Sequence, residues 1–247
     1  MPGSRRVSNE QGSGSEMIAS LPNFILVVAP PILLGTTAVM FKWLSARFGP
    51  VRGYLGGFLF YWIGWCLCLP LSLLGTDGFL RLFQPAQPPF GSPGWLGIAL
   101  LLGPVVVPFL TVFPAAIRGA SRSAVLYTLL FALANGIMEE VLWRGTYVSI
   151  FPNDWWWGYL YPAIWFGLWH LAPQTVYPFK GPGGAIGFAA LAVVMGLSFG
   201  WIARQTGSIL WTAAAHVLNN FSSVGGRTFT GEEGPSGRAG EPGKADG

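Results

Sequence analysis

Charged residues are scarce in this sequence. Asp, Glu, Lys and Arg together make up 10% of the 247 residues, against about 25% in an average soluble domain. A chain so poor in charge lacks the solvated side chains that cover a globular enzyme in water, which argues against that class. It also argues against disorder of the whole chain, because disorder combines high charge with low hydrophobicity and 52% of these residues are hydrophobic.

Cysteines are few and basic clusters are missing. Cys66 and Cys68 stand in one apolar run. They are too close for an ordinary structural disulfide and have no second pair with which to form a zinc site, so we interpret them as small hydrophobic residues. The 14 Lys and Arg residues exceed the 10 Asp and Glu residues by four, but they occur singly or in pairs. Without a basic stripe the sequence predicts no nucleic-acid partner, and the mild excess suits a membrane protein with cationic loops.

Long segments without charge are abundant instead. A helix needs about 20 mostly apolar residues to cross a bilayer, and some of the segments found here are shorter or interrupted by Pro and Gly. The segments are 17–41, 53–76, 95–113, 123–138, 155–179, 181–203 and 205–226. The sequence therefore predicts an all-α fold, a polytopic integral membrane bundle of about seven to eight transmembrane helices that is embedded in the lipid bilayer.

The two ends of the chain differ in composition from the membrane-embedded domain, for which we expect residues 17–224. Residues 1–16 are polar and form an N-terminal arm. Residues 225–247 are rich in Gly, Pro and charge and almost free of large apolar side chains, which predicts a disordered tail.

The cationic loops carry a weak signal for orientation. Strict alternation of the segments puts one group of basic residues and the tail on one face, and Arg5, Arg6, Arg81 and Arg204 on the other. The positive-inside rule then favours the first group as cytoplasmic. That group consists of Lys42, Arg47, Arg52, Arg118, Arg122 and Lys180.

Four ionisable residues stand out because they lie in apolar segments. Both histidines of the sequence do so, His170 and His216, and so do Glu139 and Glu140 at the end of an apolar run. The remaining glutamates lie in the arm or the tail. Ionisable groups inside a membrane are costly and mark functional sites.

The two glutamates precede an arginine at helical spacing. Glu140 and Arg144 are four residues apart, with the acid on the N-terminal side, which is the favourable orientation for an ion pair on one helix face. Glu139 points about 100° away from Glu140 around the axis, so its carboxylate is left for chemistry. The alternative is an ordinary ion pair at a helix end on the surface.

The two histidines stand in similar four-residue patterns. Phe166 and His170 share one helix face, and His216 shares another with Asn220, for which Asn219 is a possible substitute. A single membrane histidine often only makes a hydrogen bond between helices. Two histidines, an asparagine and a carboxylate, each at helical spacing, are harder to explain by packing.

These elements resemble the signatures EExxxR, FxxxH and HxxxN of the intramembrane CAAX-protease and bacteriocin-processing family, which includes the Ras-converting type II prenyl endopeptidases. The three are intact and in order within residues 122–222. They read Glu139-Glu140-x-x-x-Arg144, Phe166-x-x-x-His170 and His216-x-x-x-Asn220. The resemblance implies an intramembrane endopeptidase of the bacterial cytoplasmic membrane, whose substrate is a peptide or protein, lipidated or membrane-anchored in some members.

The resemblance also implies roles for these residues. Glu139 is the general base, assisted by His170, and acts directly on a water molecule. His216 and Asn220 polarise the scissile carbonyl and hold the oxyanion. The supporting residues are Glu140, Arg144 and Phe166, of which the ion pair positions the helix and sets the local field.

Two other classes of protein stay open. In a zinc hydrolase, Glu139, His170 and His216 would be the ligands, with water in the fourth position. The sequence has no HExxH, and a glutamate ligand could not also be the base, so we expect no metal cofactor.

A non-enzymatic scaffold, immunity or transport protein would also use intramembrane Glu and His, and it would be recognised if Glu139 could be lost without loss of the phenotype. A serine nucleophile at Ser198 fits poorly, because Gly196-x-Ser198-x-Gly200 lies in an apolar helix and not at a strand–turn–helix elbow.

Overall fold

The computed structural model describes residues 20–232, which form helices and no strand. The predicted all-α class is confirmed for this part of the chain. The predicted N-terminal arm, residues 1–16, lies outside the described residues, as do residues 233–247.

The helices follow one another closely along the chain, and several are continued by short π-helical segments. In chain order they are α2 (Leu21–Phe48), α3 (Pro50–Phe60), η1 (Tyr61–Cys68), α4 (Leu69–Arg81), α5 (Gly94–Thr111), α6 (Phe113–Ile117), α7 (Arg122–Glu140), η2 (Val141–Thr146), α8 (Tyr147–Ile150), η3 (Trp156–Leu160), α9 (Tyr161–Trp169), η4 (Pro173–Thr175), α10 (Gly184–Thr206), α11 (Leu210–Ser222) and α12 (Arg227–Thr230).

Five of the helical stretches are long and apolar enough to cross a membrane. They are Leu21–Phe48, Pro50–Arg81, Gly94–Thr111, Arg122–Ile150 and Gly184–Thr206. This supports an integral membrane protein, but it does not confirm the predicted count of seven to eight. The other two predicted segments form the shorter helices α9 and α11, of 9 and 13 residues. At about 1.5 Å per residue, 13 residues rise about 20 Å, which is less than the hydrocarbon thickness of about 30 Å.

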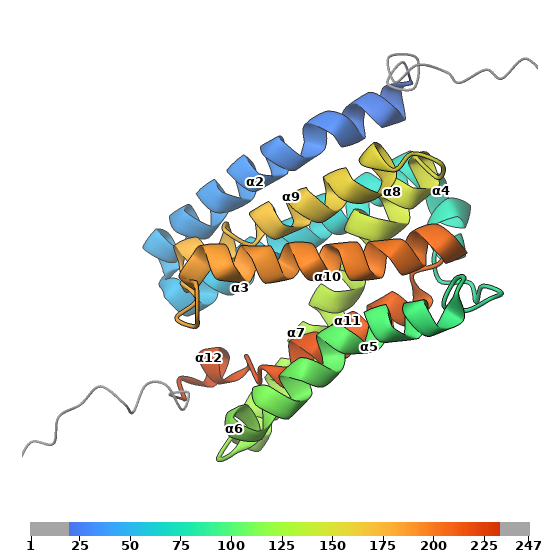
Figure 1. Ribbon diagram of the computed structural model, residues 1–247. Coiled ribbons are helices and arrows are strands. Elements are labelled where there is room, and N and C mark those ends of the chain that lie inside the picture. The colour runs from blue at the N-terminus through green and yellow to red at the C-terminus, as the bar shows by residue number, and fades with distance from the viewer. Residues whose placement is uncertain (1–19, 233–247) are drawn as a thin grey trace, which may run out of the picture.

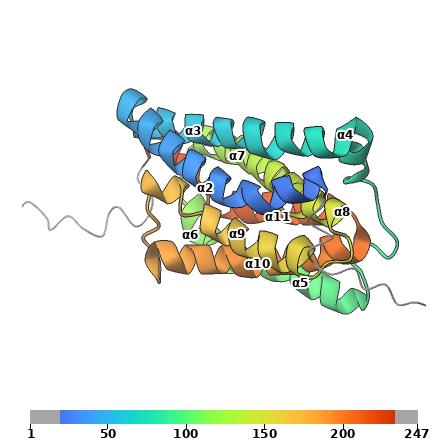
Figure 2. The same ribbon diagram turned by 90° about the horizontal axis from the view of Figure 1, so that it is seen from above.

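The short helix α11 packs beside the long helix α7, whose first half carries exposed apolar side chains such as Leu126 and Leu130. Figure 2 shows α3 and α4 along one edge and α10 and α5 along the other, with α7 and α11 between them. In Figure 1, α2, α9 and α10 run side by side, and contacts between α2 and α9 and between α9 and α10 agree with that view. α11 packs against α7 on one side and α5 on the other.

Glycines bring α2 and α3 into close contact. A Cβ atom at Gly53 would lie 2.3 Å from the backbone of Ser45, and one at Gly57 would lie 2.3 Å from the ring of Phe41. The GxxxG spacing of Gly53 and Gly57 therefore serves helix–helix packing, as small residues at this spacing commonly do in membranes.

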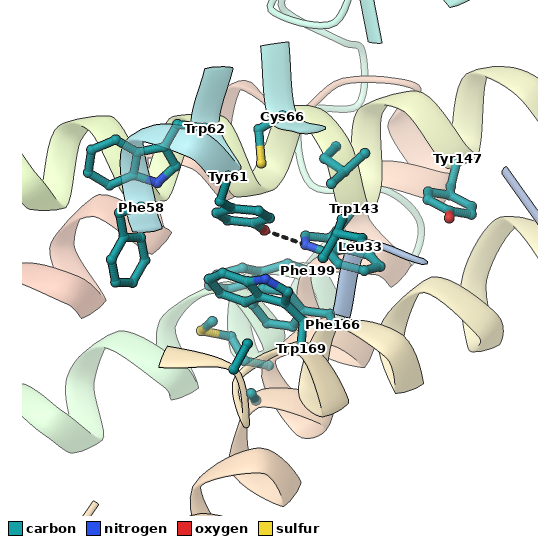
Figure 3. Packing of buried hydrophobic residues seen from close by; sticks show 14 of the residues in the cluster. Leu33, Phe58, Tyr61, Trp62, Cys66, Trp143, Tyr147, Phe166, Trp169 and Phe199 are labelled. Carbon is teal, nitrogen blue, oxygen red and sulfur yellow. Dashed lines mark hydrogen bonds between the residues drawn. The ribbon is translucent and has the colours of Figure 1, made fainter. Parts of the chain in front are cut away.

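A cluster of buried aromatic rings joins two of the π-helical segments, η1 and η2, to α9 (Figure 3). The indole N–H of Trp143 in η2 donates a hydrogen bond of 2.7 Å to the hydroxyl oxygen of Tyr61 in η1. The ring of Tyr61 stacks on Trp169 at a centroid distance of 3.9 Å. π-Helical turns inside α-helices occur frequently at functional sites, and here both flank the end of α7.

The basic loops gather at one end of the bundle. Figures 1 and 2 agree that the end of α2, the start of α3, α6 and the start of α10 lie at this end, while α4, α8 and the start of α5 lie at the other. The loops that carry the first group of basic residues therefore lie at one end of the described part of the chain, as the alternation of the segments across the membrane predicts. This holds although two of the seven predicted segments form short helices.

The predicted disordered tail, residues 225–247, differs from the structure at its start. Residues 225–232 are described and contain α12, which packs against α7. The backbone N–H of Gly226 donates a hydrogen bond of 2.9 Å to Thr128 Oγ1. A Gly- and charge-rich segment can be ordered in this way because hydrogen bonds to a neighbouring helix replace the missing apolar contacts.

Candidate active site

Glu140 and Arg144 form the predicted ion pair, and it is buried. Arg144 Nη1 lies 3.1 Å from Glu140 Oε1, with exposed fractions of 2% and 0% for the two side chains. The alternative of a surface pair at a helix end is therefore wrong. The helix continues past Glu140 through the π-helical η2, so both residues lie within the span Arg122–Ile150 and not at its end.

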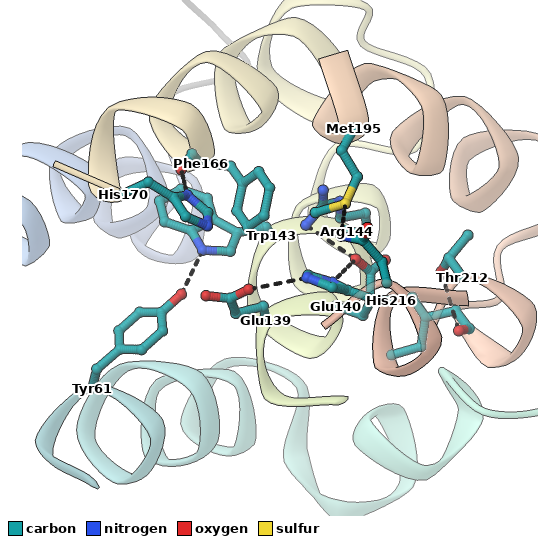
Figure 4. Close-up of polar contacts among 12 residues, drawn as sticks. Tyr61, Glu139, Glu140, Trp143, Arg144, Phe166, His170, Met195, Thr212 and His216 are labelled. Carbon is teal, nitrogen blue, oxygen red and sulfur yellow. Dashed lines mark hydrogen bonds and ion pairs between the residues drawn. The ribbon is translucent and has the colours of Figure 1, made fainter. Parts of the chain in front are cut away.

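His216 of α11 lies between the two glutamates of α7 (Figure 4). Its Nδ1 atom is 2.9 Å from Glu140 Oε1, and its Nε2 atom is 3.3 Å from Glu139 Oε2. All three side chains are at most 1% exposed. Glu139, which sequence spacing left without a partner, therefore contacts an imidazole in the folded protein.

A glycine allows this contact between α7 and α11. A Cβ atom at Gly136 would lie 2.7 Å from the backbone nitrogen of Val217, so only glycine lets the two backbones approach so closely. Gly136 stands one turn before Glu139 and Glu140, and Val217 follows His216. The close crossing of the helices thus brings the imidazole within reach of both carboxylates.

The four groups form a linear series: Arg144, Glu140, His216 and Glu139. Arg144 and His216 Nδ1 both face the same oxygen of Glu140, so Glu140 is the carboxylate with a permanent countercharge. With Nδ1–H donating to Glu140, the Nε2 atom can either donate to an ionised Glu139 or accept from a protonated one. Neither oxygen of Glu139 has a hydrogen-bond partner among the described residues, so the 3.3 Å contact with His216 is one of distance and charge.

Phe166 occupies the space among the charged and imidazole groups. The guanidinium carbon of Arg144 lies 4.0 Å from the centroid of its ring, within the range of a cation–π interaction. The rings of His170 and His216 meet it nearly edge-on, with centroid distances of 4.6 and 6.0 Å. The phenylalanine of the second motif thus holds the residues of all three motifs in place.

The orientation of His170 fixes its tautomer. Its Nδ1 atom lies 2.7 Å from the backbone oxygen of Phe166. A carbonyl oxygen can only accept a hydrogen bond, so Nδ1 carries the proton and donates. The neutral imidazole then keeps its lone pair on Nε2, where it can accept a proton or bind a positive centre.

A cavity of about 670 Å³ adjoins this cluster and is lined by three of the predicted catalytic residues, Glu139, His170 and Asn220. Asn220 Nδ2 is buried and has no hydrogen-bond partner among the described residues, so it can donate to a bound group. His216 does not line the cavity, and both of its ring nitrogens face carboxylates, which differs from the predicted position at an oxyanion. Eight aromatic side chains also line the cavity: Tyr54, Phe58, Phe131, Trp169, Tyr177, Phe179, Phe188 and Phe229.

The cavity is also lined by polar side chains that sequence reasoning missed, among them Asn135 and Trp169. Asn135 stands one turn before Glu139 and accepts a hydrogen bond of 2.9 Å from the indole N–H of Trp62. Its position as an amide in an apolar helix, four residues before Glu139, was a signal that could have revealed it. Trp169 carries a buried indole N–H with no hydrogen-bond partner among the described residues, and no sequence pattern distinguishes it from the other eleven tryptophans.

The zinc hydrolase alternative requires the donor atoms of Glu139, His170 and His216 to converge on one metal position. Within residues 20–232 no group of three or more His, Cys, Asp and Glu side chains is arranged to hold a metal ion. The donor atoms of His216 are directed at the carboxylates of α7, whereas His170 faces the cavity.

Comparison with known proteins identifies the part of the chain that carries these residues. Residues 121–222 match the model of a protein family described as Rce1-like, type II CAAX prenyl endopeptidase. The match runs from the residue before α7 to the end of α11 and includes all three motifs. It confirms the resemblance drawn from the motifs, and since the family is one of proteases, it supports an enzyme. Neither a curated protein nor a solved structure matches the chain.

Proposed function

Because residues 121–222 are Rce1-like, we propose that the protein is an intramembrane endopeptidase that hydrolyses a peptide bond with a water molecule activated by Glu139 and His170. One observation carries the proposal. Glu139, His170 and Asn220 come from three motifs far apart in the sequence, and they line the same cavity. A base, a second proton acceptor and an amide donor around one space are the groups that peptide hydrolysis needs.

The proposed reaction starts with a water molecule in the cavity between Glu139 and His170. Glu139 takes one proton of the water while the water oxygen attacks the scissile carbonyl carbon. The π electrons of the C=O bond move to the carbonyl oxygen. Asn220 Nδ2–H donates to the oxyanion so formed. The tetrahedral intermediate then collapses with cleavage of the C–N bond, and the proton held by Glu139 passes to the leaving amine. Nε2 of His170 accepts a hydrogen bond from the water and orients it.

We assign His216 to Glu139 and not to the oxyanion. Its contacts at 2.9 and 3.3 Å link the Arg144–Glu140 pair to Glu139. At this distance a hydrogen bond between His216 and Glu139 can form or break as the charge on Glu139 changes during the reaction. Buried hydrogen-bonded networks of this kind hold their members in one geometry, and the base is thereby oriented toward the cavity.

The cavity fits a peptide that carries a large apolar group. Its volume of about 670 Å³ is within the range of small-molecule sites, about 300–1,000 Å³, and eight aromatic side chains line it. Together with the name of the matched family, this supports a prenylated protein ending in a CAAX sequence as the substrate.

The wall includes Tyr177, Lys180 and Gly226 near the basic end of the bundle, so the positive-inside rule supports an opening on the cytoplasmic side. The bacterial cytoplasmic membrane stays a prediction.

A cleavage assay tests the function directly. The purified protein in liposomes is incubated with a farnesylated peptide that ends in a CAAX sequence, and with the same peptide lacking the farnesyl group. We expect mass spectrometry to detect hydrolysis of one peptide bond, faster for the farnesylated peptide. No cleavage of either peptide by well-folded protein would argue against this function.

Replacing Asn220 with alanine is expected to lower kcat by about 10²–10³-fold, with little change in KM. This is the typical effect of removing one oxyanion donor, because the interaction is made mainly in the transition state. Steady-state kinetics of the cleavage assay measure both constants. Asn219→Ala is the matched control, since Asn219 contacts Met195 Sδ at 3.2 Å and does not line the cavity. Equal kinetics for the two variants would contradict the role of Asn220.

Cleavage is expected to survive exhaustive treatment with EDTA or phenanthroline. The proposed steps use only a carboxylate, an imidazole and an amide, so no metal needs to be retained. The measurement is the initial rate before and after chelation, with total zinc determined in the same sample. Loss of activity that zinc restores would replace the metal-free mechanism with one in which Glu139, His170 and His216 are ligands.

A further inference from the structure

The segment of residues 225–232, which follows α11, forms part of the cavity wall. Four of its residues line the cavity that contains Glu139: Gly225, Gly226, Thr228 and Phe229. The ring of Phe229 lies 5.6 Å from that of Phe131 in α7 and 6.4 Å from that of Tyr54 in α3. These two rings also line the cavity, so Phe229 closes it with an aromatic side chain that no motif of the family includes.

The segment is attached to the bundle by hydrogen bonds and by the ring contacts of Phe229, and no residue of α12 is buried. Gly226 N–H donates to Thr128 Oγ1, and the guanidinium of Arg227 donates to the backbone oxygen of Arg118 at 2.6 Å. The carboxylate of Glu232 accepts hydrogen bonds from the backbone N–H and the hydroxyl of Ser121, which lower the pKa of Glu232. Elements with few buried apolar contacts open at low cost in free energy.

Two backbone features fix where the segment lies. Val224, between α11 and α12, has a φ angle of +48°, which is rare and unfavourable for a β-branched residue. At Gly226 a Cβ atom would lie 2.0 Å from the backbone oxygen of Ala124 and 2.5 Å from the backbone nitrogen of Thr128. A side chain at this position would therefore displace the segment from α7.

We propose that residues 225–232 are the wall that determines which substrates the cavity accepts, with Phe229 limiting the size of the apolar group that can bind. The ring of Phe229 fills space next to Tyr54 and Phe131, and its removal would leave room for a longer apolar group. The inference rests on the proposed function, since it assigns selectivity to the same site.

The first experiment compares two substrates in the Phe229→Ala variant. They are CAAX peptides that are identical except for a farnesyl group in one and the longer geranylgeranyl group in the other. We expect the ratio of kcat/KM, longer over shorter, to rise at least about tenfold, which is the lower end of the effect of a single methylene group in an apolar pocket. Phe48→Ala is the control, since Phe48 is 52% exposed at the end of α2 and does not line the cavity. An unchanged ratio in Phe229→Ala would contradict the proposal.

A second experiment needs no protease activity. Ala124 is 0% exposed, and its backbone oxygen lies next to Gly226. A cysteine placed at Ala124, with Cys66 and Cys68 replaced by alanine, keeps the hydrogen bond of Gly226 to Thr128 and reports on the segment through its reaction with a maleimide. We expect Gly226→Ala to speed labelling several-fold. Gly225→Ala is the matched control, because a Cβ atom there meets only Ser223 Oγ at 3.6 Å. Equal labelling of the two variants would show that the segment is not a displaceable wall.

The two experiments together separate the possible failures. If the wild type cleaves neither peptide but Gly226→Ala exposes the cysteine, the proposed protease function is wrong, whereas residues 225–232 are still a displaceable wall of the cavity. If both peptides are cleaved but neither the ratio nor the labelling changes, the protein is a protease and the role of residues 225–232 in selectivity is wrong.

Discussion

Glu139→Gln is expected to reduce the cleavage rate by about 10²–10⁴-fold, the usual contribution of a general base. Glutamine keeps the size of the side chain and can still form a hydrogen bond with His216, but its amide cannot take a proton from water. Folding should therefore be preserved. The measurements are the initial rate in liposomes, the yield of extracted protein and its thermal unfolding.

The matched control for this variant is Asp77→Asn, which also replaces one carboxylate with an amide. Asp77 is exposed in α4 and does not line the cavity, so its loss should leave the rate unchanged. Near-normal cleavage by Glu139→Gln, together with a folded but inactive Glu140→Gln, would mean that the two glutamates exchange roles. If these variants and His170→Ala were all functional in the cell, the non-enzymatic scaffold or carrier interpretation would apply.

Glu140→Gln is expected to destabilise the protein by about 3–5 kcal/mol, the typical cost of removing one partner of a buried ion pair. Arg144 is 2% exposed and its Nη1 atom lies 3.1 Å from Glu140, so the substitution leaves a buried guanidinium without its countercharge. His216 Nδ1 loses its charged acceptor as well. Thermal unfolding and the yield after extraction measure the loss, and activity should fall with them.

A double variant separates the charge effect from a loss of packing. Glu140→Gln with Arg144→Met removes both charges and keeps most of the side-chain volume, so we expect it to be more stable than Glu140→Gln alone. Replacement of a whole buried pair by apolar groups is often neutral. A double variant that is less stable than either single variant would contradict the view that the uncompensated charge is the cause.

The membrane class and the motifs could be predicted from the sequence because both depend on local properties. Apolar segments such as 17–41 and 181–203 are long enough to span a bilayer whatever their neighbours. Spacings of four residues put Glu140 with Arg144, and Phe166 with His170, on one helix face by the geometry of the helix alone. The predicted count of seven to eight is not confirmed, since the segments 155–179 and 205–226 contain the shorter helices α9 and α11, and hydropathy does not reveal where a helix ends.

Contacts between helices were decided only by the tertiary structure. Sequence spacing correctly paired Glu140 with Arg144, but it left Glu139 without a partner. The crossing of α7 and α11 at Gly136 brings His216 against both carboxylates, so an imidazole predicted at the oxyanion lies between two glutamates. Phe229 likewise lines the cavity from a segment whose composition predicted disorder. Periodicity fixes which residues share a face of one helix, whereas the distance between two helices depends on the packing of both and on residues far apart in the chain.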